Sequence, residues 1–157
     1  MKSTIKYLVL IIMCWVCGEN LQAQPYMLSD GLSGLLVNAI YKDSEGFIWL
    51  GTDNGLDRFD GVKVKHFEFR GVDSGRKKRV NCITETDNKQ LWIGNGIGLW
   101  RLNRSGSELQ RIVPEKIDCA VNALLADGDV LYIGTARGLF IQKDGQLLQV
   151  QTDKNML

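Results

Sequence analysis

Histidine and proline are scarce in this chain of 157 residues, which holds one histidine, His66, and two prolines. With a single histidine, we expect neither a Ser-His-Asp triad nor a histidine-rich metal site within the chain. We place His66 on the surface, where its replacement by alanine should be nearly silent. No segment shows sustained helical periodicity, and neither prolines nor low-complexity tracts interrupt a pattern of short strands.

A long hydrophobic run is also missing. The most apolar segment, from Tyr7 to about Val16, is shorter than the roughly 18 to 20 residues that a membrane-spanning helix needs. It follows Lys2 and Lys6 and is followed by a small residue, Ala23, which is the pattern of a secretory signal peptide. We therefore predict a cleaved signal peptide over residues 1–23, export to the periplasm, and no membrane span in this chain.

The chain has little net charge. Residues 1–23 contain two of the 19 basic and one of the 18 acidic side chains, so 17 of each remain after cleavage. Nucleic-acid-binding proteins usually carry a basic stripe, whereas the one basic run here is Arg76-Lys77-Lys78-Arg79. That run lies between two repeats and is expected to be a solvated loop. Nucleic acid is therefore not an expected partner.

What the sequence has in abundance is internal repetition. Three similar segments begin with Val-Asn at intervals of 43 and 41 residues. They read VNAIYKDSEGFIWLGTDNGLDRFD, VNCITETDNKQLWIGNGIGLWRLN and VNALLADGDVLYIGTARGLFIQKD. Each has an aromatic residue, then an aliphatic residue and a glycine, and a second glycine four residues later. These structural repeat residues are Trp49, Gly51 and Gly55, then Trp92, Gly94 and Gly98, then Tyr132, Gly134 and Gly138.

Each repeat is predicted to form four short strands. In the first repeat, Phe47–Thr52 is an apolar run that should be buried on both faces, and Leu56–Phe59 alternates apolar and polar residues. Between them, Asp53-Asn54-Gly55 should supply the positive-φ residues of a tight hairpin. A weaker fourth strand follows in every repeat.

Four strands in about 40 to 45 residues is the spacing of a β-propeller blade. The sequence thus predicts an all-β fold with three four-stranded antiparallel blades in an incomplete ring. The blades should occupy about residues 37–69, 80–113 and 121–151, within a repeat region that spans residues 24–157.

The repeated residues should pack the blades against one another. One sheet cannot bury its faces alone, so we expect Trp49, Trp92 and Tyr132 to form the core between neighbouring blades. The glycines should allow the blades to approach closely.

Two cysteines, Cys82 and Cys119, remain after cleavage. Cys82 occupies the position of Ala39 and Ala123, which predicts a small buried strand residue. Two cysteines do not make a disulfide framework, and both a bridge between them and a metal site are disfavoured.

No catalytic constellation is recognisable. The aspartates of the first repeat are expected to form turns, and they are Asp43, Asp53, Asp57 and Asp60. The glycine-rich stretch 94–98 precedes a strand, whereas a phosphate-binding loop should open a helix. We therefore assign no catalytic residue, metal ligand or cofactor, and the ligand-binding residues stay unidentified at this point.

The first repeat resembles the repeat of the two-component regulator propeller family. That pattern runs Val-Asn, a strand, Asp-x-x-Gly, x-x-Trp-x-Gly-Thr and Gly-Leu-x-x-Phe/Tyr. The second repeat departs from it at Lys89, where the turn glycine is usual, and at Asn95, where threonine is usual. The third has Tyr132 for the tryptophan and a turn one residue shorter. Gly31-Leu32-Ser33 resembles the lead-in to the first blade, and the resemblance covers nearly all of residues 25–151.

The resemblance implies the periplasmic sensor half of a Bacteroidetes hybrid two-component system, in which large propellers sense glycan fragments and signal to a histidine kinase and its phosphorelay. The chain is then expected to be an amino-terminal fragment of such a sensor that binds an oligosaccharide without catalysis. The alternative is a stand-alone secreted propeller-repeat protein that assembles with itself or with partner chains. An enzyme is the least favoured reading.

Closed propellers have about four to eight blades, so the remaining blades or another copy of the chain are the expected partners. Tyr26-Met27-Leu28 is expected to be a strand that completes the last blade of such a ring.

Export makes a direct prediction. Amino-terminal sequencing of the exported protein should begin near Gln24, because the signal peptide is expected to end at Ala23. Recovery of cytosolic protein that retains Met1 would contradict the prediction.

Overall fold

The computed structural model describes residues 31–72, 78–103, 106–113 and 115–150. Twelve strands in these ranges form three four-stranded antiparallel sheets, which confirms the predicted fold class. The strands are β1 (Val37–Lys42), β2 (Ile48–Thr52), β3 (Leu56–Phe59), β4 (Val64–Phe67), β5 (Val80–Glu85), β6 (Leu91–Asn95), β7 (Gly98–Leu102), β8 (Leu109–Ile112), β9 (Val121–Asp127), β10 (Val130–Thr135), β11 (Gly138–Lys143) and β12 (Gln146–Gln149).

Some of the predictions made from the sequence concern residues outside these ranges. The signal peptide, the Tyr26-Met27-Leu28 strand, and Arg76 and Lys77 of the basic run all lie outside the described residues. Within the described residues, no helix has the length and apolarity that crossing a membrane would require.

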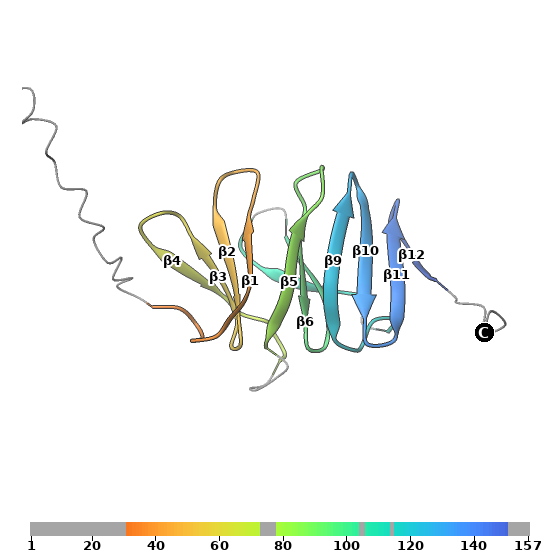
Figure 1. The fold of residues 1–157 in the computed structure, drawn as a ribbon, viewed down its shortest axis with the longest axis horizontal. Helices are drawn as coiled ribbons and strands as arrows, with labels where there is room; N and C mark the ends of the chain where they lie inside the picture. Colours follow the sequence, from red (N-terminus) through yellow and green to blue (C-terminus); the bar gives the residue numbers. More distant parts are fainter. Residues whose placement is uncertain (1–30, 73–77, 104–105, 114, 151–157) are drawn as a thin grey trace, which may run out of the picture.

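Every sheet keeps its strands in chain order, so each strand pairs with the next through a hairpin. We call the sheets blade 1 (β1–β4), blade 2 (β5–β8) and blade 3 (β9–β12). The blades stand side by side along the long axis of Figure 1, and their first strands β1, β5 and β9 lie next to one another. The described residues thus form three consecutive blades of an open arrangement.

A β-bulge marks the Val-Asn pair that begins each repeat. The strand register shifts between Val37 and Ala39 in blade 1 and between Val80 and Cys82 in blade 2, and blade 3 has the corresponding shift beside Gly134. A bulge adds one residue to a strand and re-aims a neighbouring side chain. The repeated Val-Asn pair is therefore a structural device at the inner edge of every blade.

The valine after each blade boundary lies against a glycine of the preceding blade. Val80 and Val121 are both 0% exposed. A β-carbon placed on Gly51 would stand 2.5 Å from Val80 Cγ1, and one placed on Gly94 would stand 2.6 Å from Val121 Cγ1. We call these two contacts the valine–glycine seats, because each glycine leaves a hollow that the valine fills.

Two hydrophobic cores lie between the blades and surround the seats. The core between blades 1 and 2 contains Trp49, Leu56, Phe67, Phe69, Val80, Leu91, Ile93, Trp100, Leu102 and Leu109. The core between blades 2 and 3 contains Trp92, Leu99, Ile117, Val121, Leu131, Ile133 and Phe140. Trp49 and Trp92 are only 2% and 4% exposed, so the repeated tryptophans lie in the inter-blade cores.

Hydrogen bonds also join the first hairpin turns of neighbouring blades. The Glu85 carboxylate accepts bonds from the Ser44 N–H at 2.8 Å and the Ser44 hydroxyl at 3.1 Å. Asp129 accepts a bond from the Asn88 N–H at 2.9 Å. Such exposed bonds contribute modestly to stability, about 1 kcal/mol each, but they fix the position of one blade relative to the next.

Tyr132 does not join an inter-blade core, which corrects the expectation for the third repeat. It is half-buried and lies on the face of blade 3 that points away from blade 2. A row of cross-strand neighbours, Leu125, Tyr132, Ile141 and Leu148, crosses this face. Leu125 and Leu148 are 63% and 60% exposed. The tyrosine stays half-exposed because no described strand covers this face.

The second strand of blade 1 is likewise not buried on both faces. Trp49 is buried against blade 2, but Ile48 and Leu50 on the opposite face are only half-buried. In blade 2, which lies between two blades, all five residues of β6 are buried. Burial of a second strand on both faces therefore requires a blade on either side.

The backbone angle φ distinguishes two kinds of turn in the blades. Gly46 has φ 94°, and in blade 2 the matching residue, Lys89, adopts φ 61° although it carries a side chain. Gly55, in contrast, does not have a positive φ, so the predicted tight hairpin of that type is wrong. Its turn is closed instead by the Thr52 N–H and hydroxyl, which both donate to the Gly55 carbonyl, at 2.8 and 3.0 Å.

Cys82 and Cys119 are both free. Burial raises the pKa of the Cys82 thiol to about 12. The thiol therefore stays protonated near neutral pH and is a poor nucleophile, as expected of a small strand residue packed against Gly94.

The seats predict different costs for the same substitution at equivalent glycines. Gly94→Ala should lower the free energy of unfolding by about 1 to 3 kcal/mol, because the new methyl group would overlap Val121 and Cys82. Gly134→Ala is the matched control and should stay within about 0.5 kcal/mol, since its nearest neighbour would be Ala123 Cβ at an ordinary 3.4 Å. Urea unfolding of both variants tests this, and equal losses would contradict it.

Candidate functional site

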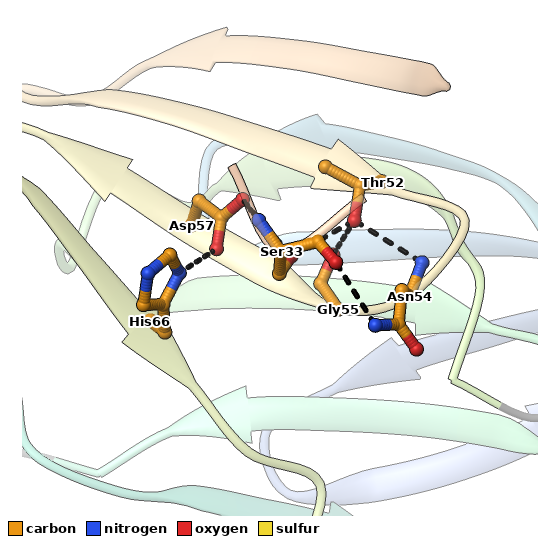
Figure 2. A network of polar contacts seen from close by, with 6 residues as sticks. All are labelled: Ser33, Thr52, Asn54, Gly55, Asp57 and His66. Atoms are coloured by element: carbon orange, nitrogen blue, oxygen red, sulfur yellow. Dashed lines mark hydrogen bonds and ion pairs between the residues drawn. The ribbon is translucent and has the colours of Figure 1, made fainter. Parts of the chain in front are cut away.

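Asp57 in β3 is a buried carboxylate on the face of blade 1 that points away from blade 2. Its side chain is 0% exposed and accepts hydrogen bonds from the Ser33 N–H at 2.8 Å and the Ser33 hydroxyl at 2.9 Å (Figure 2). The prediction that Asp57 forms a turn is wrong, because β3 runs through it and it pairs with His66 of β4. At the corresponding positions, blades 2 and 3 have Trp100 and Phe140, which fill the inter-blade cores.

His66 is the third member of this network. Its side chain is 43% exposed, as expected for a surface residue, but Nδ1 lies 2.7 Å from Asp57 Oδ1. This contact argues against the expectation that the loss of His66 is nearly silent. Without the imidazole, a buried carboxylate would lose one of its hydrogen-bonding partners.

The structure thus brings a serine, an aspartate and a histidine together, although no Ser-His-Asp triad is expected from the sequence. The order of contacts differs from that of a hydrolase triad. There the imidazole lies between the serine and the carboxylate and takes the serine proton. Here the carboxylate lies between the other two, and the Ser33 hydroxyl donates to Asp57 or contacts Thr52. The imidazole is therefore not placed to activate the Ser33 hydroxyl. We call the network of Ser33, Asp57 and His66 the clamp, because it ties Ser33 to blade 1.

The clamp holds the lead-in segment, which we define as residues 31–36, onto the β2–β3 hairpin. Asn54 Nδ2 donates to the Ser33 carbonyl at 2.9 Å, and the Ser33 and Thr52 hydroxyls lie 2.9 Å apart (Figure 2). At Gly34, an added β-carbon would lie 2.0 Å from Asp53 Oδ1. The lead-in segment therefore packs directly on blade 1.

A cavity of about 990 Å³ lies at the opposite end of the blades. Its lining includes the first hairpin turns of blades 1 and 2 and reaches Gln142 and Gly145 of blade 3. Known ligand pockets have volumes of about 300 to 1,000 Å³, so this cavity has room for a small ligand. Its charged lining residues are the carboxylates Asp43, Glu45 and Glu85 and the cations Arg58, Lys89 and Arg101.

Two of the carboxylates hold the surrounding backbone. Asp43 accepts bonds from the Glu45 N–H at 3.0 Å, the Phe47 N–H at 2.9 Å and Trp49 Nε1 at 2.7 Å. Glu85 binds Ser44 of the neighbouring blade. Asp43 therefore forms a turn, as predicted.

Asp60 is also a turn residue. The backbone N–H groups of Lys63 and Val62 donate to its carboxylate at 2.7 and 2.8 Å and lower its pKa. It lies in the β3–β4 turn and is engaged with its own loop.

Each of the two arginines in the cavity lies over a repeated tryptophan. Arg58 pairs across the strands with Trp49, and its guanidinium carbon lies 5.7 Å from that ring and 4.1 Å from the Phe47 ring. Arg101 pairs with Trp92 at 5.9 Å. Each guanidinium group therefore lies within cation–π distance of a repeated tryptophan.

Aromatic stacking platforms and metal sites are not evident in the part of the chain that the structure describes. No aromatic side chain there is fully exposed, and the most accessible ones, Tyr41, Phe47, Phe59 and Tyr132, are half-buried. Within the same ranges, no group of three or more His, Cys, Asp or Glu side chains is close enough to hold a metal ion. A ligand in the cavity would thus meet mainly charged and amide groups.

Comparison with known proteins gives a family match for the first repeat. Residues 31–54 match the model of the family described as Two component regulator propeller, which confirms the resemblance seen in the sequence. Histidine kinase P4 from Formosa agariphila is 28% identical over an alignment of 88 residues, and the match covers 51% of this chain and 6% of that kinase.

Solved structures share the fold. One is the extracellular domain of BT4673 from B. thetaiotaomicron, described as a hybrid two-component system, with a TM-score of 0.66 and 22% identity over 85% of this chain and 19% of that one. A second structure of BT4673, described as a one-component system, has a TM-score of 0.66 and 26% identity over 81% and 17%. BT3049, a hybrid two-component system from the same organism, has a TM-score of 0.64 and 22% identity over 83% and 18%. The chain spans less than a fifth of the length of each.

Of the repeat residues identified from the sequence, Trp49, Gly51, Trp92 and Gly94 mark contacts between blades, whereas Tyr132 and Gly134 do not. The clamp brings together Asp57 and His66, which the sequence analysis had assigned to a turn and to the surface, and Ser33, to which it gave no contact. Ser33 approaches Asp57 only through the fold, because the two are separated by 24 positions. The arginines do leave a signal in the sequence. An arginine follows the repeated tryptophan after nine residues in both of the first two repeats, at Arg58 and Arg101.

The clamp predicts that His66 contributes to stability. His66→Ala should lower the free energy of unfolding by about 1 to 2 kcal/mol, because it removes a partner from the buried Asp57 carboxylate. Glu68→Ala, at an exposed position two residues later, is the control and should stay within about 0.5 kcal/mol. Urea unfolding compares the two, and indistinguishable midpoints would show that the imidazole does not support the clamp.

Proposed function

We propose that this chain supplies part of the ligand-sensing propeller of a periplasmic two-component sensor, and that the ligand is an oligosaccharide. The observation that carries the proposal is a combination of features in one chain. It forms three blades joined by valine–glycine seats, it matches the family model at residues 31–54, and it shares its fold with extracellular sensor domains. In this proposal the chain is exported by its signal peptide and carries out no bond chemistry. The kinase and phosphorelay belong to other parts of the sensor.

The cavity supports a sensing role because its lining comes from three blades. A ligand that contacts several blades at once binds best to one relative arrangement of them. It can therefore shift the population of blade arrangements by its difference in affinity between them. Such a shift, passed on through the neighbouring blades, is the signal that we propose.

The chemistry of the cavity suits a polar ligand. Amide side chains, among them Gln90, Gln110 and Gln142, line it beside the charged groups. Because the repeated tryptophans are buried, recognition of sugar hydroxyls would depend on hydrogen bonds from these groups and much less on ring stacking.

The open face of blade 3 favours a second property, assembly. Gly134 corresponds to Gly51 and Gly94, yet the atoms nearest to it belong to Ala123 of its own blade and not to a valine of another. The exposed row that includes Leu125 and Leu148 crosses the same strand at Tyr132, two residues before Gly134. We propose that further blades or a second copy of the chain cover this face, which is also what a stand-alone propeller-repeat protein would need.

Ligand binding tests the function directly. The full-length protein should be screened by thermal unfolding and calorimetry against neutral and acidic oligosaccharides, with glycerol at the same mass concentration as the control. At least one saccharide should bind saturably and raise the melting temperature by about 5 °C or more at a hundred times its dissociation constant. If no member of the panel binds, the oligosaccharide-sensing function is wrong.

A further inference from the structure

The cavity holds two arginines within cation–π distance of aromatic rings, and the shortest of these contacts is the 4.1 Å from the Arg58 guanidinium carbon to the Phe47 centroid. Arg58 lies over Trp49 and Phe47, and Arg101 lies over Trp92. An arginine that is stacked on a ring keeps the N–H donors at the edge of its guanidinium available, because they lie in the plane of the group. Stacking also reduces the freedom of the side chain, so less freedom remains to be lost when an acceptor binds.

Neither arginine has an anionic partner among the described residues. Arg58 Nε is buried and has no hydrogen-bond acceptor. Arg101 has only a long contact of 3.5 Å from Nη2 to Gln110 Oε1. On the surface, by contrast, Arg70 pairs with Glu108 and Arg137 pairs with Asp118. A buried donor without an acceptor is costly and rare, so Arg58 Nε calls for an explanation.

The carboxylates of the same cavity do not supply the missing acceptors. Asp43 already accepts three bonds from its own turn and from Trp49, and Glu85 is bonded to Ser44. The remaining acid, Glu45, is exposed, as is the remaining cation, Lys89. None of these three carboxylates forms a hydrogen bond or ion pair with Arg58 or Arg101, so the two guanidinium groups are open to an acceptor that enters the cavity.

We propose that Arg58 and Arg101 bind an anionic group of the ligand, a carboxylate or a sulfate ester. Both groups present two or more oxygens that match the planar fork of a guanidinium, and the resulting charge-assisted bonds are stronger than neutral ones. That the ligand is a saccharide rests on the proposed function. The anion site specifies the class of saccharide: an acidic sugar in preference to a neutral one.

The test uses the full-length protein and probes of known chemistry. Inorganic sulfate and glucuronate are titrated at constant ionic strength, with chloride and glucose as their counterparts. The readout is the NMR signal of the Trp49 and Trp92 indole N–H groups, which lie at the cavity. Variants are Arg58→Gln and Arg101→Gln, with Arg58→Lys to keep the charge without the fork and Arg137→Gln as a surface control. Thermal unfolding verifies that each variant is folded.

We expect sulfate and glucuronate to shift both indole signals saturably in the wild type and in Arg137→Gln. Binding should weaken about 10- to 100-fold in Arg58→Gln and Arg101→Gln, with Arg58→Lys in between. Equal affinity in the wild type and both Gln variants, or glucose binding as tightly as glucuronate, overturns the anion site while oligosaccharide sensing could still stand. Arginine-dependent binding of the anions with no oligosaccharide bound supports the site and contradicts the sensing function.

Discussion

The arrangement of the blades depends on the contact between a valine and a glycine across each blade boundary. Val80 and Val121 fill hollows that exist only because Gly51 and Gly94 have no side chain. The bulge at each Val-Asn pair re-aims the valine, and the hollow then sets how closely two sheets approach. Trp49 and Trp92 are buried around these contacts, and the bonds between the hairpin turns fix the remaining orientation.

The two ends of this stack differ in chemistry. On the outer face of blade 3, no described residue of another blade fills the seat at Gly134, and Leu125 and Leu148 on this face are exposed. On the outer face of blade 1, Asp57 replaces the aromatic residue found in the other blades, and the lead-in segment is bound there through Ser33. The outer face of blade 1 therefore combines this bound polar cluster with apolar side chains such as Ile40, which is 70% exposed, whereas the exposed row on blade 3 is apolar and has no such cluster.

The sequence was sufficient for the fold because the constraint acts on residues that recur in every repeat, such as Val80, Gly51 and Trp49. The predictions from the sequence were wrong where the burial of a residue depends on whether another blade or segment packs against its own blade. Tyr132 has the pattern of a core aromatic and is half-exposed, since nothing described covers it. Asp57 has the pattern of a turn former and is a buried strand residue, because contacts with Ser33 and His66 cannot be inferred from local spacing. The cavity was missed for the same reason, although the recurring Trp–Arg spacing pointed to its two arginines.

The most direct test of the seat as the controlling contact is a double-mutant cycle between Gly51 and Val80. Gly51→Ala, Val80→Ala and the double variant are unfolded in urea beside the wild type. Because truncation of Val80 removes the Cγ1 atom that an alanine at position 51 would overlap, Gly51→Ala should cost at least about 1 kcal/mol less in the Val80→Ala background than in the wild type. Losses that add within about 0.3 to 0.5 kcal/mol would show that the two residues do not share a seat, and would contradict the account.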